Sequence, residues 1–236
     1  MGGLFITGTD TGVGKTEVTV ALMRWASRQG LNVTGMKPVA CGCVPTDEGL
    51  RNDDALRLLK ASPILLTYDE VNPYAYESPI SPHLAARMAM RPIDLADVAG
   101  RCRDLERRSD GILVEGIGGW EVPLGEGIRV SHLARSLGLP VILVVAMRLG
   151  CLNHALLTHE AILLSGLECA GWIANDMTGC MANLEANIET LKSELSTPCL
   201  GVLAHRNGDV PASGEGGQSS RFYWLSDDEI LRRLRG

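Results

Sequence analysis

The stretch FITGTDTGVGKTEV, residues 5–18, decides the fold, because it joins an apolar strand to a helix through a glycine-rich loop. The strict P-loop motif has four residues between its first glycine and Gly-Lys-Ser/Thr, whereas five separate Gly8 from Gly14-Lys15-Thr16. The loop can still bind phosphate despite this difference, because its backbone N–H groups and the helix N-terminus would face the anion. Lys15 can reach the β and γ oxygens of a nucleotide, and the Thr16 hydroxyl can hold Mg²⁺. The alternative is a glycine-rich turn with a solvated lysine, which the strand–loop–helix context disfavours.

Composition is typical of a globular enzyme, with 236 residues, 45% hydrophobic and 21% charged. This length suits a single domain over residues 1–236. The net charge of −6 disfavours nucleic-acid binding, which requires a basic face, and the longest apolar run, 139–147, is too short for a bilayer. We expect no secretory leader, and the seven cysteines contain no CxxC, so a disulfide scaffold or zinc site is not expected. These features predict a cytoplasmic protein without a nucleic-acid or membrane partner.

Short apolar strands alternate with helical segments along the chain. The predicted strands cover residues 3–8, 32–40, 111–116, 140–146, 169–176 and 199–204. Such alternation predicts an α/β, P-loop NTPase-like fold, with a mostly parallel sheet and helices on both faces. Ligands then gather at the carboxyl ends of the strands. The polar segment 205–221 predicts a mobile loop before a short C-terminal helix.

Polar side chains follow three of these predicted strands. Lys37, followed by Pro38, ends one strand, although a lone lysine in such a place is more often solvated. Glu115 ends a buried strand, as acids beside Mg²⁺ do in P-loop enzymes, and a carboxylate there is costly unless it meets a cation. Asn175 ends a third strand, and its amide complements the donor and acceptor edge of adenine.

Two further polar clusters open predicted helices. Asp53 and Asp54 begin the helix over 52–62, where Asn52 or Asp53 can serve as the cap. Residues 150–153, Gly-Cys-Leu-Asn, begin another helix, whose N-terminus can hold an anion. The alternative is that the asparagine of this stretch merely caps its own helix.

Seven motifs, in this order, resemble those of the dethiobiotin synthetase family of biotin biosynthesis. They are GTDTGVGKT, KPVACG, LRNDDAL, VNPYAYESPISPH, VEGIGGW, RLGCLNHALLT and GWIAND, within residues 4 to about 176. The resemblance implies a homodimeric, Mg-ATP-dependent ligase that closes the ureido ring of 7,8-diaminononanoate with CO₂ or bicarbonate as carbon source. The products would be dethiobiotin, ADP and phosphate, formed through a carbamate and a carbamic-phosphate anhydride that the second amine attacks.

The resemblance also implies roles for particular residues. Lys15, Lys37 and Thr11 would be catalytic, and the two lysines would neutralise charge at the γ-phosphate and carbamate. The Mg²⁺ ligands would be Thr16, Asp54 and Glu115, hard oxygen donors that suit this ion. The nucleotide site would contain Gly12, Val13, Gly14, Lys15, Thr16, Asp54, Glu115, Gly116, Ile117, Gly118, Asn175 and Asp176. The diamine would contact Thr11, Lys37, Cys41 and Ser81, and its carboxylate end would contact Gly150, Cys151, Leu152 and Asn153 of the neighbouring subunit.

The chain departs from the family pattern at two places. Cys41 stands where the family usually has serine, and a thiol is a weaker hydrogen-bond partner than a hydroxyl. Either the thiol takes over the contact with the carbamate, or the neighbouring backbone makes it. The tail after Ala204 diverges, so base contacts near residues 204–211 do not carry over.

Two other protein classes share the predicted fold. Switch ATPases of the partitioning or cell-division type carry an additional lysine early in the loop, which GTDTGVGKT lacks. Their membrane-binding members need a basic amphipathic helix, whereas the terminal DDEILRRLRG is short and of mixed charge. Cobyrinate-type synthases carry a further glutaminase domain, which we do not expect in these residues.

Overall fold

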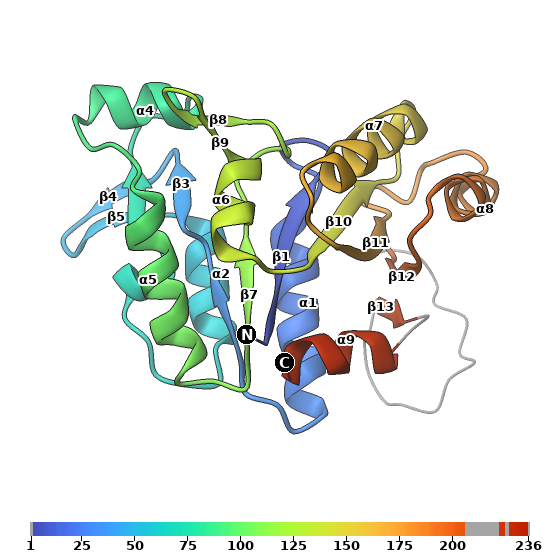
Figure 1. Ribbon diagram of the computed structural model, residues 1–236, viewed down its shortest axis with the longest axis horizontal. Coiled ribbons are helices and arrows are strands. Elements are labelled where there is room, and N and C mark those ends of the chain that lie inside the picture. Colours follow the sequence, from blue (N-terminus) through green and yellow to red (C-terminus); the bar gives the residue numbers. More distant parts are fainter. Residues whose placement is uncertain (1, 206–221, 225–226, 236) are drawn as a thin grey trace.

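The central element of the computed structural model, which describes residues 2–205, 222–224 and 227–235, is a seven-stranded sheet (Figure 1). Its order is β13-β12-β11-β10-β1-β7-β2. The strands are β1 (Gly3–Gly8), β2 (Val33–Met36), β7 (Gly111–Glu115), β10 (Val141–Ala146), β11 (Cys169–Asn175), β12 (Cys199–Leu203) and β13 (Phe222–Trp224). Adjacent strands pair in parallel, except that β13 runs antiparallel to β12. The predicted mostly parallel sheet is therefore confirmed.

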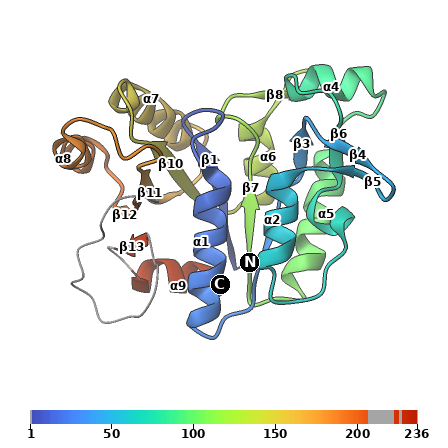
Figure 2. The same cartoon turned by 180° about the vertical axis from the view of Figure 1, so that it is seen from behind.

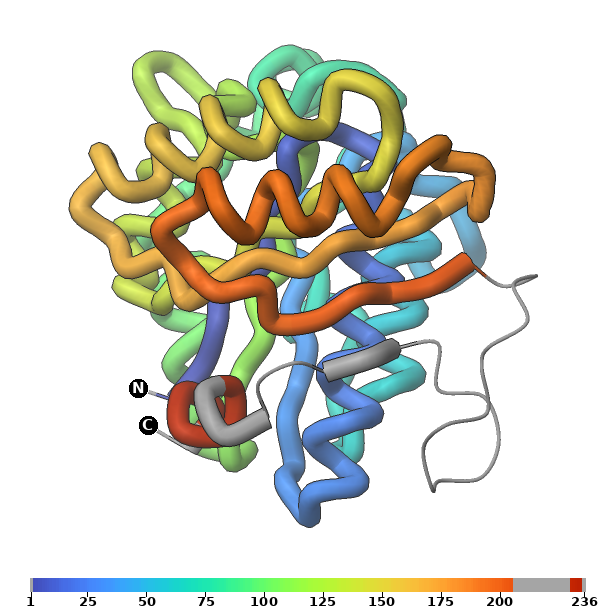
Figure 3. The backbone as a smooth tube through the Cα atoms, turned by 90° about the vertical axis from the view of Figure 1, so that its right-hand side faces the viewer, coloured from blue at the N-terminus to red at the C-terminus, as the bar shows by residue number. Residues whose placement is uncertain are grey.

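Helices cover both faces of this sheet, as predicted. In the described residues they are α1 (Lys15–Arg28), α2 (Asp53–Ala61), α3 (Tyr68–Val71), α4 (Pro82–Met88), α5 (Leu95–Glu106), α6 (Val130–Leu137), α7 (Cys151–Leu164), α8 (Leu184–Glu194) and α9 (Asp227–Arg235). Helices α1 and α2 lie on one face, in front in Figure 2, while α5, α6 and α7 lie on the other. Helix α8 runs beside α7 at the β11–β12 side of the sheet (Figure 3).

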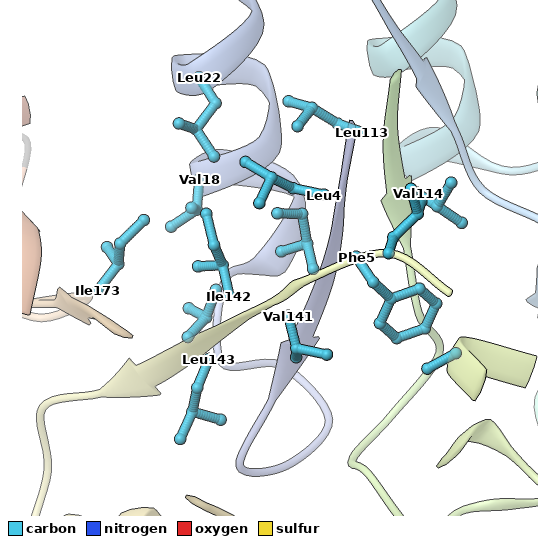
Figure 4. Close-up of a cluster of buried hydrophobic side chains, with 14 of the residues drawn as sticks. Leu4, Phe5, Val18, Leu22, Leu113, Val114, Val141, Ile142, Leu143 and Ile173 are labelled. Atoms are coloured by element: carbon cyan, nitrogen blue, oxygen red, sulfur yellow. The ribbon is translucent and has the colours of Figure 1, made fainter. Parts of the chain in front are cut away.

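Aliphatic side chains fill the space between the sheet and the helices. Strands β1, β7, β10 and β11 are buried along their whole length. Figure 4 shows Leu4 and Ile142 of the sheet facing Val18 and Leu22 of α1. Each such fully buried side chain contributes about 1.5–3 kcal/mol to folding. This packing holds the carboxyl ends of the central strands, and the polar residues that follow them, in place.

The predicted strand over residues 32–40 is wrong in one respect, because it forms two strands in different sheets. Strand β2 ends at Met36, and β3 (Val39–Cys41) pairs with β6 (Tyr74–Tyr76) in a separate two-stranded sheet. Pro38 lies between them and has no N–H to donate to a ladder. The chain therefore leaves the main sheet at Lys37, whose N–H donates to the Val71 carbonyl oxygen.

Two short antiparallel hairpins were not predicted. They are β4 (Val44–Thr46) with β5 (Gly49–Arg51), and β8 (Pro123–Gly125) with β9 (Ile128–Arg129). The predicted C-terminal helix is confirmed as α9, whereas the loop predicted over 205–221 lies, beyond residue 205, outside the described residues. No helix in the described part of the chain combines the length and apolarity needed to cross a bilayer.

Candidate active site

The glycine-rich loop joins β1 to α1 and leaves the first N–H groups of α1 without a side-chain cap. Gly14, the N-cap residue, has a φ of 84°. A Cβ atom at Gly14 would lie 2.0 Å from Nδ2 of Asn175, so a side chain here would displace the Asn175 amide as well as strain the backbone. The same Nδ2 donates a hydrogen bond of 2.8 Å to the Val13 carbonyl oxygen. Asn175 at the end of β11 thus braces the loop, and the uncapped helix N-terminus can bind an anion.

Lys15 is the first residue of α1 and is only 6% exposed. Its Nζ donates to the carbonyl oxygens of Asp10 at 3.0 Å and Gly118 at 2.6 Å. Burial, followed by the positive charge of Lys37, lowers the pKa of Lys15 to about 8. An anion beside this ammonium group favours its protonated form. Lys15 therefore links the loop to the segment after β7 and provides positive charge at the helix N-terminus.

Lys37, which follows β2, contacts residues at the end of β7 and at the start of α2. Its Nζ donates to Glu115 Oε1 at 2.6 Å, to Asp54 Oδ2 at 3.2 Å and to the Gly116 carbonyl oxygen at 3.3 Å. Thr16 Oγ1 donates to the same Glu115 oxygen at 2.7 Å. Lys37 and Thr16 therefore meet at the Glu115 carboxylate, and Asp54 joins this cluster through Lys37, as the carboxyl ends of parallel strands allow.

The charges in this cluster stabilise one another. Burial alone would lower the pKa of Lys37, but the adjacent carboxylates of Glu115 and Asp54 outweigh it and raise that pKa. Burial would likewise raise the pKa of Asp54, yet Lys37, a hydrogen bond from Thr16 and, more weakly, Arg57 lower it. Lys37 and Asp54 are thus held charged near neutral pH, which suits a site that handles phosphate anions.

The oxygen atoms of this cluster fit a magnesium ion. Glu115 Oε2 is buried and has no hydrogen-bond partner among the described residues, although such atoms are usually paired. Thr16 Oγ1 bonds the other oxygen of this carboxylate, and Asp54 shares Lys37 with it as a partner. In the described chain, no three His, Cys, Asp or Glu side chains form a metal cluster. A site with few protein oxygens agrees with Mg²⁺, which keeps several waters and nucleotide phosphates as ligands.

A cleft of about 810 Å³ opens above this cluster. From the predicted site its lining includes Thr11, Gly12, Gly14, Lys15, Thr16, Lys37, Cys41, Asp54, Ser81, Glu115, Ile117 and Gly118. Another part of the lining is apolar and consists of Pro79, Ile80, Pro82, Ile117 and Val122. Burial raises the pKa of the half-buried Cys41 thiol to about 11, so this group is neutral. The cleft therefore combines a charged floor with an apolar side.

Eight predicted residues lie outside the lining of this cleft: Val13, Gly116, Asn175, Asp176 and residues 150–153. The carbonyl oxygens of Val13 and Gly116 accept hydrogen bonds from Asn175 and Lys37, respectively. Asp176 accepts a hydrogen bond from the Gly179 N–H at 2.9 Å, and Asn175 contacts the loop from behind. Residues 150–153 lie at the start of α7, whose N-cap is Gly150 with a φ of 92°. Because Gly150 is the N-cap and no side chain caps α7, the alternative that Asn153 caps its own helix is wrong; Asn153 is the third residue of α7 and is exposed. Expected base contacts at residues 206–211 lie outside the described residues.

Several residues of the cleft were not predicted. Among them are Glu17, Asn52, Arg57 and Met177. Arg57 follows Asp54 by three residues on α2, so the two lie on the same face of the helix. This spacing could have identified Arg57 from the sequence. Asn52 was considered only as a cap, and it is the N-cap of α2, accepting from the Ala55 N–H at 3.3 Å.

Comparison with solved structures supports the fold. The MinC:MinD cell division protein complex of Aquifex aeolicus aligns with a TM-score of 0.56 at 18% identity, over 88% of this chain and 83% of that chain. Chloroplast FtsY of Physcomitrella patens aligns with a TM-score of 0.54 at 16% identity, over 99% of this chain and 64% of that chain. At these identities the likeness concerns the fold alone, which is P-loop NTPase-like.

Sequence comparison is more specific. The protein family described as "AAA domain" matches residues 2–208. The ATP-dependent dethiobiotin synthetase of Cellvibrio japonicus is 50% identical over 199 residues, 84% of this chain and 87% of that protein. The corresponding synthetase of Pseudomonas paraeruginosa is 50% identical over 214 residues, 90% of this chain and 94% of that protein. Since identity of this level extends over nearly the full length of both relatives, the chain belongs to the family of ATP-dependent dethiobiotin synthetases.

Proposed function

We propose that the protein closes the ureido ring of 7,8-diaminononanoate with CO₂ at the expense of ATP, giving dethiobiotin, ADP and phosphate. Its family consists of ATP-dependent ligases that form C–N bonds. One observation carries the proposal for this chain: the cleft joins a phosphate-binding loop and the Lys37–Glu115 cluster to an apolar side. That combination suits a reaction between a nucleotide and an alkyl diamine.

The nucleotide phosphates would lie at the N-terminus of α1. Gly12 and Gly14 expose backbone there, and Lys15 would exchange its two carbonyl partners for phosphate oxygens. Thr16, Asp54 and Glu115 would hold Mg²⁺, which when bound neutralises phosphate charge. Asn175, which contacts the loop at the Val13 carbonyl oxygen, and Asp176, which follows it, would recognise the base.

The reaction needs positioning and charge neutralisation rather than a nucleophilic side chain. One substrate amine adds to CO₂ and loses a proton to form a carbamate. The carbamate oxygen attacks the γ-phosphorus and ADP leaves. The second amine then attacks the carbamic-phosphate carbon, expels phosphate and loses a proton, which closes the ring. Lys37 faces the cleft beside Lys15, so its ammonium group would stabilise the negative charge that develops on the transferred group. Thr11, Cys41 and Ser81 would orient the diamine.

The apolar side of the cleft suits the alkyl chain of this substrate. Pro79, Ile80 and Val122 provide surface that methylene groups can bury, at about 0.8 kcal/mol for each CH₂. No basic side chain other than Lys15, Lys37 and Arg57 lines the described part of the cleft. Since these three lie on the nucleotide side, the substrate carboxylate at the far end of the alkyl chain would need another partner.

We propose that a second copy of the chain provides that partner, so that each active site is shared between two subunits. The start of α7 lies outside its own cleft and carries N–H groups without a side-chain cap. Exposed leucines follow one another at a spacing of seven, from Leu149 just before this helix to Leu156 and Leu163 within it, and Leu157 and Leu164 lie beside the last two. An exposed apolar stripe of this kind marks an interface. A two-fold dimer would cover it and bring residues 150–153 to the neighbouring cleft.

A phosphate-release assay tests the proposed reaction. Diaminononanoate and bicarbonate are omitted in turn, and we expect release only when both are present with Mg-ATP. Mass spectrometry of the complete reaction should show dethiobiotin. Release that needs neither compound and rises with lipid or DNA would instead indicate a switch ATPase.

A further inference from the structure

Two of the proposed Mg²⁺ ligands come from separate helices that lie side by side. Thr16 is on α1 and Asp54 is on α2, and these helices pack together on the same face of the sheet (Figure 2). Glu115 is fully buried in β7, whereas the Asp54 side chain is 42% exposed. Burial therefore fixes the Glu115 carboxylate. The distance between Asp54 and Thr16, in contrast, depends on how α1 and α2 are held together.

An ion pair joins the two helices next to these ligands. Arg57 Nη2 lies 2.8 Å from Glu17 Oε1. Glu17 directly follows Thr16, and Arg57 lies three residues, about one helical turn, after Asp54. Both residues line the cleft; the Glu17 side chain is 38% exposed and the Arg57 side chain is 41% exposed. The pair therefore links Glu17, the neighbour of Thr16 on α1, to the face of α2 that carries Asp54.

We propose that Arg57 and Glu17 are positioning residues that set the spacing of Thr16 and Asp54 and so strengthen binding of magnesium-nucleotide. The inference rests on the proposed metal site and extends it to two residues outside that site. Arg57 acts through Asp54, because its guanidinium group is held by Glu17 and its charge lies close to the Asp54 carboxylate. Partly exposed ion pairs contribute little, so the expected effect is a two- to fivefold change, roughly the scale of such pairs.

Equilibrium binding of ADP to the full chain, in Mg²⁺ and in EDTA, tests this proposal. Arg57→Met and Glu17→Gln should each weaken binding of Mg-ADP by about two- to fivefold and leave binding of metal-free ADP unchanged. The exchange Glu17→Arg with Arg57→Glu should recover most of the loss, since it restores the pair in reverse. Arg129→Met is the matched control, because Arg129 forms an exposed 2.8 Å pair with Glu121 that does not line the cleft.

Each other outcome has a distinct meaning. Equal Mg²⁺ enhancement in wild type and both single variants would overturn the positioning role. Loss of metal-free ADP binding in Arg57→Met, without recovery in the exchanged variant, would show that Arg57 contacts phosphate directly and would also overturn it. If Mg²⁺ leaves ADP binding to the wild type unchanged, the proposed metal site itself fails. Thermal unfolding of every variant checks that the fold is retained.

Discussion

Lys37 Nζ lies 2.6 Å from Glu115 Oε1, and the two side chains are 5% and 0% exposed. The desolvation cost of a buried ion pair commonly offsets its Coulomb energy, so this pair is weak evidence for stability. Glu115 instead has a buried second oxygen without a partner in the described chain, and Lys37 faces the cleft. These features agree with the proposed role of Lys37 in charge neutralisation.

Lys37→Ala should lower kcat by at least ~10²-fold, the scale for removing one preorganised charge donor. Binding of ADP should persist, because the loop and Lys15 remain. The variant should also lose about 3–5 kcal/mol of unfolding free energy, since Glu115 is left as an unpaired buried charge. Steady-state kinetics, calorimetric binding and urea unfolding measure the three quantities.

The double variant Lys37→Met with Glu115→Gln distinguishes the effect on turnover from the effect on stability. It removes both charges, so stability should return toward that of the wild type while turnover stays low. Unchanged kcat in Lys37→Ala would remove Lys37 from the mechanism.

ADP binding should take up a proton above pH 8. The pKa of Lys15 is lowered from 10.5 to about 8 in the free protein, and a bound phosphate favours the protonated form. The free protein loses this proton as pH rises through 8, so affinity should fall above that pH. The uptake at pH 8.5 should therefore be several times larger than at pH 7, where Lys15 of the free protein is mostly protonated. Calorimetry in two buffers of different ionisation enthalpy measures it, and equal uptake at both pH values would contradict the assignment.

Gly14→Ala and Gly12→Ala should behave differently although both positions have positive φ, 84° and 71°. A Cβ at position 14 meets Nδ2 of Asn175 at 2.0 Å, whereas nothing lies within 4 Å of a Cβ at position 12. Both variants carry a strain of about 1–2 kcal/mol, but only Gly14→Ala should displace the loop and abolish ADP binding. Adding Asn175→Ala should relieve the clash and recover part of the thermal stability. Equal ADP affinity of the two single variants would contradict this account of Gly14.

Cys41 should react slowly with iodoacetamide, because its pKa of about 11 leaves little thiolate at pH 8. The exposed Cys180 is the internal reference and should be labelled first. At pH 9.5, diaminononanoate should protect Cys41 but not Cys180, and peptide mass spectrometry resolves the two sites. Cys41→Ser should remain active. Identical Cys41 labelling with and without substrate would place this side chain outside the diamine site.

The sequence predicted the local parts of the site better than its long-range contacts. The loop from Gly8 to Thr16 was recognisable because its function depends on neighbouring backbone groups. Lys37 and Glu115 were each expected at a strand end, and pairing of Met36 with Val114 in β2 and β7 places them next to each other. The strand order that creates this pairing is not encoded in any local pattern.

The difference between local patterns and long-range contacts also explains which features were not predicted. The Arg57–Glu17 pair and the brace from Asn175 to Val13 depend on how separate elements pack. The hairpin β4–β5 contains strands of three residues, which are too short for hydrophobic periodicity to reveal.

The proposed shared site can be tested by mixing two variants of low activity. One carries Lys15→Ala, which removes the cation at the phosphate loop. The other carries Asn153→Asp, which keeps the shape of an exposed residue at the start of α7 but adds a negative charge that repels a carboxylate. At diaminononanoate concentrations near the wild-type KM, each homodimer should have little activity, and the mixture is assayed under the same condition. Native mass spectrometry confirms dimers and subunit exchange before activity is measured.

If each site takes Lys15 from one subunit and Asn153 from its mate, a heterodimer holds one intact site and one doubly damaged site. Random assembly makes about half of the dimers hetero, so about a quarter of wild-type activity should return under two-fold symmetry. The Asn153→Asp defect should appear in the KM for diaminononanoate, because only the carboxylate contact is changed. If both residues act within one chain, every site keeps one defect and mixing restores nothing. No recovery after confirmed exchange would therefore defeat the shared site and leave α7 as an interface alone.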